Sequence, residues 1–147
     1  LDARGPVCRC GNRGCVELTV GGRALLEHAR RTHPDLNGLA GLVAKAEAGD
    51  PGCRRLLSDA GTALGIALGG LVNLLNPERI VLGGELGPAA FMIEPLRRGL
   101  ADTGMPAAVG AVEVVPAELG ERAAALGGVA LVLKATEHAA SHFAAVP

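Results

Sequence analysis

Aromatic side chains are almost absent from this chain. Its 147 residues include no Trp, no Tyr and only two Phe, Phe91 and Phe143. Proteins that stack nucleic-acid bases or sugars on a flat surface depend on aromatic rings. The composition therefore excludes that mode of recognition. Aliphatic side chains must fill the core, and the 49% of hydrophobic residues supply enough of them for one domain.

An excess of charge of one sign is also missing. The formal net charge is -1 at pH 7, and basic residues form only short clusters such as Arg30-Arg31 and Arg97-Arg98. A surface that follows a nucleic-acid backbone needs a stripe of Lys and Arg side chains. We therefore expect that these residues do not bind DNA, and that DNA would be a partner only through a further N-terminal domain.

Long hydrophobic runs, signal sequences and nucleophilic serines are lacking as well. The longest apolar run, residues 60–75, is broken by glycines and falls short of the roughly 18 residues of a membrane span. The N-terminus has no charged segment followed by an apolar one, as a secretory signal would. The only serines, Ser58 and Ser141, lie in expected helix or tail segments. We expect a cytoplasmic protein without a membrane partner.

What the chain does contain is an alternation of helix and strand patterns. Helices are expected over about 22–32, 39–48, 51–75, 88–103 and 120–138, and short strands over 79–82 and 112–115. This order indicates an α/β fold with a parallel sheet covered by helices on its faces. Residues after about 138 are small and are expected to form a C-terminal tail over 139–147.

Three glycines recur every fourth residue in the longest expected helix. Gly61, Gly65 and Gly69 share one helix face, although a glycine inside a helix costs roughly 1 kcal/mol relative to Ala. Two interpretations stay open. Another helix or sheet packs closely against this face, or a ligand approaches the backbone there.

The richest motif is CRCGNRGCVE, which contains three of the four cysteines. Cys8, Cys10 and Cys15 have C-x-C-x4-C spacing within a glycine-containing loop. In a reducing compartment such a cluster binds metal more often than it forms disulfides, and thiolates suit zinc. A redox-sensitive cluster and incidental cysteines are the alternatives. Tetrahedral zinc needs a fourth ligand, and His28, His33 and Cys53 are candidates, none of them compelling.

Two further motifs have both a structural and a functional interpretation. Glu17 follows the last loop cysteine, where it either stabilises a helix N-terminus or accepts hydrogen bonds from sugar hydroxyls. Gly83 and Gly84 follow an expected strand and precede a helix, where backbone N–H groups can face a nucleotide. They match no phosphate-binding consensus, so the residues by themselves favour a plain strand-to-helix turn over a nucleotide contact.

CRCGNRGCVE, followed by GTALGIALGGLVNLLNPERIVLGGEL and PAELGERAAALGG, resembles the C-terminal portion of the ROK family of repressors, open reading frames and sugar kinases. The resemblance extends from Leu1 to about Leu133 and implies part of the second domain of an actin-like ATPase (ribonuclease H-like) fold. On that basis we expect a partial sugar-binding domain over 1–138, with its zinc loop at 7–17.

The resemblance also implies roles for particular residues. Cys8, Cys10 and Cys15 would bind zinc together with a His located upstream of this chain, and Glu17 would contact a sugar. Gly83 and Gly84 match the segment that approaches ATP in the kinases. No Asp of this chain matches the catalytic Asp of those kinases, and the phosphate-binding strands are missing too. These residues alone would therefore phosphorylate nothing.

Within the family, the late segment Gly120-Glu-Arg-Ala123 departs from the Gly-Asn/Asp-Asp-Ala pattern that is usual in the kinases. This departure favours the effector-binding domain of a sugar-responsive transcriptional regulator over part of an ATP-dependent sugar kinase such as a glucokinase. The family resemblance, together with apolar faces that a partial domain leaves exposed, further implies a homo-oligomer.

Overall fold

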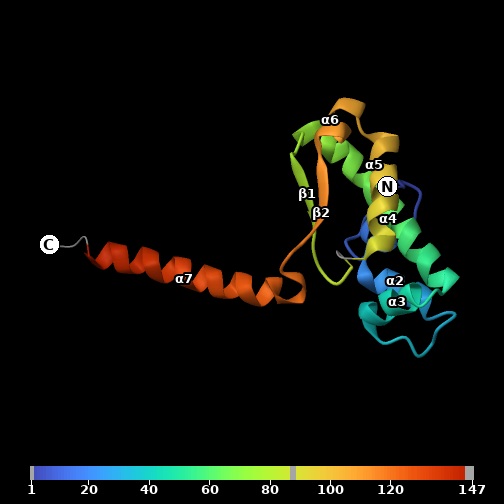
Figure 1. Ribbon diagram of the computed structural model, residues 1–147, viewed down its shortest axis with the longest axis horizontal. Helices are drawn as coiled ribbons and strands as arrows, with labels where there is room; N and C mark the ends of the chain where they lie inside the picture. Colours follow the sequence, from blue (N-terminus) through green and yellow to red (C-terminus); the bar gives the residue numbers. More distant parts are fainter. Residues whose placement is uncertain (1, 87–88, 145–147) are drawn as a thin grey trace.

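A computed structural model describes residues 2–86 and 89–144 of the chain (Figure 1). The elements in chain order are α1 (Glu17–Val20), α2 (Gly22–Ala29), α3 (Gly38–Glu47), α4 (Pro51–Leu75), β1 (Arg79–Leu82), α5 (Ala90–Thr103), α6 (Pro106–Ala111), β2 (Glu113–Pro116), the 3-10 turn η1 (Gly120–Arg122) and α7 (Ala123–Ala144). The alternation of helices and strands confirms the α/β class predicted from the sequence.

Helix α4 has the bounds that its terminal residues predict. Asp50 is its N-cap, and the Asp50 carboxylate accepts a hydrogen bond of 2.8 Å from the backbone N–H of Cys53. That hydrogen bond is the main reason why the pKa of Asp50 lies below its usual value. At the other end, Asn76 adopts the left-handed conformation (φ 43°) and Pro77 prevents continuation of the helix.

The glycine face of α4 packs against the backbone of α5. A Cβ atom built at Gly65 would lie 2.8 Å from the backbone nitrogen of Leu100, and one at Gly61 would lie 3.0 Å from the Cα of Met92. A Cβ at Gly69 would collide with Thr103, and Gly99 of α5 approaches α4 equally closely. The close-packing interpretation of the glycines is therefore confirmed, since α5 occupies this face.

Strands β1 and β2 form a parallel pair beside these two helices (Figure 1). Ile80 and Leu82 of β1 and Val114 of β2 pack on a cluster made by Val72 of α4 and Leu96 and Leu100 of α5. On the opposite face Val81 is 59% exposed. The sequence predicted helices on both faces of the sheet. Within the described ranges, helices cover only one of the two faces.

A second cluster holds the α1–α4 end of the molecule together. Leu25 of α2, Leu42 of α3 and Leu57 of α4 are each at most 1% exposed and meet in one core. This core fixes the short helices on α4, and α1 carries the residues that follow the cysteine loop.

Several boundaries differ from the sequence prediction. Helix α2 ends at Ala29 instead of about 32, because Thr32 Oγ1 donates to the Ala29 carbonyl and Arg30 donates to the Leu36 carbonyl in the turns that follow. Helices α1 and α6 were not predicted. Helix α7 continues through Ala144, beyond the predicted boundary at 138. The last part of the predicted tail, 145–147, lies outside the described residues.

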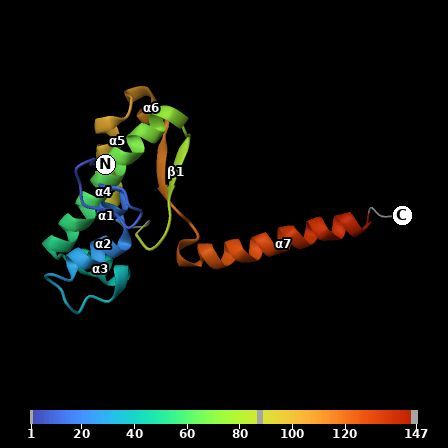
Figure 2. The same cartoon turned by 180° about the vertical axis from the view of Figure 1, so that it is seen from behind.

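Two helices bear on the question of partners. Of the described helices, α4 has the length and hydropathy that a membrane span would need. Some of its residues are buried in both core clusters, whereas Leu71, Leu74 and Leu75 are exposed. Helix α7 extends away from the rest of the molecule (Figures 1 and 2), and its large apolar side chains between Leu126 and Leu133 are exposed, Leu131 by 71%.

Candidate functional site

The cysteine loop is a compact turn held by its own backbone. The N–H of Cys8 donates to the Asn12 carbonyl at 2.7 Å, and Val7 and Arg13 form an antiparallel bridge. Gly11 (φ +89°) and Gly14 (φ +58°) adopt conformations that other residues rarely adopt. A Cβ at Gly14 would also collide with the Asp2 backbone. These two glycines are therefore required for the shape of the loop.

This loop brings the three predicted metal ligands together. The sulfur atoms of Cys8, Cys10 and Cys15 lie within 4.8 Å of one another, and those of Cys10 and Cys15 are 3.5 Å apart. Two thiolates on tetrahedral zinc are about 3.8 Å apart, given Zn–S bonds of about 2.3 Å. The donor set and its spacing therefore fit a zinc ion with little movement.

The thiols influence one another's ionisation. Hydrogen bonds to Cys10, first from the backbone N–H of Asn12 and then from the neighbouring thiols, lower the pKa of Cys10. The hydrogen bond with Cys10 is the largest cause that raises the pKa of Cys15, to about 11. Three adjacent thiolates thus need a cation to neutralise them, which is what a bound metal supplies.

The side chains considered as fourth ligand lie elsewhere. Among the described residues, no His, Asp, Glu or further Cys joins the cysteine cluster within 4.8 Å. His28 lines a separate hollow of about 580 Å³, and His33 and Cys53 belong to a different group of side chains. A His upstream of Leu1 stays a prediction that follows from the family resemblance.

Glu17 begins α1, a helix that the sequence did not predict, directly after the loop. Its side chain is exposed, and within residues 2–86 and 89–144 its carboxylate forms no hydrogen bond or ion pair. The carboxylate lies against Gly21, where a Cβ would collide with Oε1. Gly21 thus leaves room for the Glu17 side chain in this position. The sequence analysis did not identify this role, although the pair Gly21-Gly22 could have pointed to a close contact.

A small hollow connects Glu17 with the loop. It measures about 180 Å³ and is lined by Cys8, Arg9, Glu17, Leu18, Arg23, Ala24 and Glu27. Arg23 and Glu27 are paired with each other at 2.9 Å. The unpaired carboxylate of Glu17 therefore belongs to a hollow whose other charged groups include Arg9, and such groups can hydrogen-bond to a ligand rich in hydroxyl groups.

Gly83 and Gly84 follow β1, as predicted. Gly84 has φ +80°, and a Cβ at either glycine would meet no atom within 4 Å. Gly83 lines a hollow of about 320 Å³ with aliphatic and thioether side chains from α1, α4 and α5. The structure thus shows a strand-to-helix turn with open space beside it, and nucleotide binding at these glycines stays a prediction.

Comparison with known proteins shows the family to which the chain belongs. The fold is α/β, part of the actin-like ATPase architecture. A model of the ROK family matches residues 1–135, so the chain belongs to the ROK family.

Relatives with different functions resemble the chain equally well. The chain is 31% identical to a glucokinase of Thermotoga maritima, over 90% of this chain and 46% of that protein. It is also 31% identical to the xylose repressor of Bacillus subtilis, over 90% of this chain and 35% of that repressor. The chain thus spans less than half the length of these curated relatives.

A solved structure gives the same fold. The structure of a ROK family transcriptional regulator, described as a homologue of the E. coli Mlc protein, superposes with a TM-score of 0.72. Its sequence is 24% identical, and the match covers 79% of this chain and 32% of that chain. At this identity the likeness shows the fold and leaves the choice between regulator and kinase open.

Proposed function

We propose that these residues form the sugar-binding part of a ROK-family transcriptional regulator. The observation that carries sugar binding is the Glu17 carboxylate, which is exposed, unpaired among the described residues and fixed beside the cysteine loop. A carboxylate in this position accepts hydrogen bonds from two neighbouring hydroxyl groups, and such charge-assisted bonds are stronger than neutral ones.

Zinc has a structural role in this proposal. Cys8, Cys10 and Cys15 would hold it, and the ion would fix the loop that places Glu17 at the hollow. The reducing cytoplasm, where we place the protein, keeps the three thiols available for the metal.

The regulator is favoured over the kinase by residues 120–123. Their sequence is Gly-Glu-Arg-Ala, whereas the kinases usually have Gly-Asn/Asp-Asp-Ala at this place. In the structure these residues form η1 and the start of α7. The xylose repressor of B. subtilis supports a sugar-responsive regulator, and DNA would then be bound by another part of the protein. The second candidate is an ATP-dependent sugar kinase, favoured by the equal identity to the T. maritima glucokinase.

Calorimetric titration with a panel of hexoses, pentoses and N-acetylhexosamines tests the sugar site. We expect Glu17→Gln to weaken binding of the preferred sugar about tenfold or more, because each hydrogen bond to a charged group contributes roughly 1.5–3 kcal/mol. Glu47→Gln, which changes another exposed carboxylate, at the end of α3, is the matched control and should bind like the unchanged protein. Equal sugar affinities for the two variants would mean that Glu17 does not contact the sugar and only stabilises the N-terminus of its helix.

A coupled assay with ATP and the bound sugar separates regulator from kinase. It is done on the natural protein that contains these residues, since the chain spans less than half of its relatives. Binding without turnover supports the regulator. Turnover at rates typical of enzymes would reject it in favour of the kinase.

A further inference from the structure

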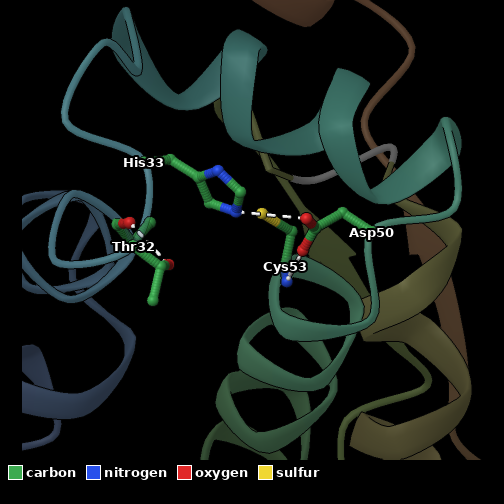
Figure 3. Close-up of polar contacts among 5 residues, drawn as sticks. Thr32, His33, Asp50 and Cys53 are labelled. Atoms are coloured by element: carbon green, nitrogen blue, oxygen red, sulfur yellow. Dashed lines mark hydrogen bonds and ion pairs between the residues drawn. The ribbon is translucent and has the colours of Figure 1, made fainter.

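A second group of metal-ligating side chains lies at the start of α4, apart from the cysteine loop. His33 comes from the turn after α2, Asp50 is the N-cap of α4, and Cys53 lies in the first turn of that helix. Figure 3 shows the three side chains pointing toward one another from these two segments. They are separated in sequence, so it is the packing of α2 and α3 on α4 that brings them together.

The distances suit a single ion. His33 Nε2 lies 3.1 Å from Asp50 Oδ2, and the ligand atoms of His33, Asp50 and Cys53 all lie within 4.8 Å of one another. Nitrogen and oxygen ligands on tetrahedral zinc are about 3.3 Å apart, given bonds of about 2.0–2.1 Å. The pair already has this spacing, and the thiol is the third ligand within reach.

Helix capping alone does not explain the group. Asp50 uses one oxygen, Oδ1, to accept the Cys53 N–H, which leaves Oδ2 directed at the imidazole. Cys53 is 2% exposed, so its thiol is enclosed beside a carboxylate and an imidazole. Capping requires neither the His nor the Cys, whereas a metal uses all three side chains.

We propose that His33 Nε2, Asp50 Oδ2 and Cys53 Sγ bind a divalent transition metal, zinc by the nature of the donors, at a site separate from the cysteine loop. A neutral imidazole, one carboxylate and one thiolate carry two negative charges in total, and these neutralise a divalent ion, as a partly buried site requires. Water completes the tetrahedron, because the side chains of His33 and Asp50 are 22% and 27% exposed.

The bound metal would cross-link two connections of the helical body. It ties the turn after α2 to the N-terminus of α4, so it would stabilise the packing of α2, α3 and α4 in the folded state. This site is independent of the proposed sugar function, and its test gives an answer whether or not the protein binds sugar.

Cobalt spectroscopy isolates the proposed site. The chain has four cysteines, so the triple variant C8S/C10S/C15S leaves Cys53 as its only thiol. Addition of Co²⁺ to this variant should produce a thiolate-to-cobalt charge-transfer absorption and the visible bands of a tetrahedral ion. Because no other thiol is present, the charge-transfer absorption, alone among these signals, can arise only at Cys53. Their absence from the folded variant would overturn the proposal.

Two further substitutions test the other ligands in the same background. Asp50→Asn keeps an oxygen that can cap α4 but loses the carboxylate, and His33→Gln removes the imidazole. Each should weaken Co²⁺ binding at least tenfold, because even the loss of a side chain that only hydrogen-bonds to a metal ligand costs about 10–100-fold in affinity. His28→Gln on α2 is the matched control and should leave the affinity unchanged. Unchanged affinity in both ligand variants would also overturn the proposal.

Zinc content of the chain with its loop intact provides a second measurement. After dialysis against a slight excess of zinc, His33→Gln should retain one zinc per chain fewer than the unchanged protein. Circular dichroism checks that both are folded. An equal zinc content would contradict the site even if the triple variant does not fold.

Discussion

At the scale of single residues, the three loop cysteines are the groups most clearly brought together for chemistry. Their sulfur atoms share one small volume, yet the hydrogen bonds between them give Cys10 and Cys15 opposite pKa shifts. Such a cluster is stable with all three thiols ionised only if a cation is bound. The metal interpretation therefore requires every one of the three sulfur atoms as a ligand, whereas the redox interpretation does not.

Replacing one loop sulfur distinguishes these interpretations. Cys10→Ser should lower the zinc content by one ion per chain, because serine is a poor ligand for zinc at neutral pH. Arg9→Gln changes the loop charge but keeps the thiols, and it should retain the metal. The measurement is metal analysis of the dialysed proteins. Unchanged zinc content in Cys10→Ser would favour a redox cluster in place of a metal site.

At the scale of elements, the contact between α4 and α5 depends on the absence of side chains. Gly65→Ala places a methyl group against the backbone of Leu96 and Leu100 and should destabilise the fold by about 1–3 kcal/mol. Gly70 lies in the same helix with no atom within 4 Å of its Cβ position, so Gly70→Ala should stabilise by about 0.5–1 kcal/mol. Urea unfolding measures both. A Gly65→Ala variant as stable as Gly70→Ala would contradict close packing.

The sequence predicted the elements whose ends carry strong signals. Asp50-Pro51 and Asn76-Pro77 defined α4, and the run Arg79–Leu82 defined β1. It did not predict α1 and α6, because helices of four and six residues are too short to show a hydrophobic period. Helices this short depend on tertiary contacts rather than on propensity.

The residues of the candidate sites likewise differ in whether the sequence predicted them. The loop cysteines and Glu17 were predicted because they lie within ten residues of one another in a single motif. The meeting of His33 with Asp50 and Cys53 was not, because it depends on how α2 and α3 fold back on α4. Local spacing carries no information on such a contact.

At the scale of the whole molecule, the apolar side chains of α7 stand out. Val129, Leu131, Val132 and Leu133 are between 57% and 71% exposed on a helix that extends from the body. Apolar groups gathered in this way indicate an interface. Leu131→Lys should shift the protein toward monomer in analytical ultracentrifugation, whereas Thr136→Lys, which adds the same charge at a polar position, should not. A monomeric unchanged chain would contradict the predicted homo-oligomer.

The backbone contact between α4 and α5 also bears on how the molecule opens. Each helix packs directly against the glycines of the other. If the two helices separated, the backbone at these glycines would be exposed to water with no side chain to cover it. Their amide protons should therefore exchange with deuterium together and slowly, whereas those of an unassociated α7 should exchange first. The glycines thus make two helices, separated in the chain by β1, one cooperative unit of unfolding.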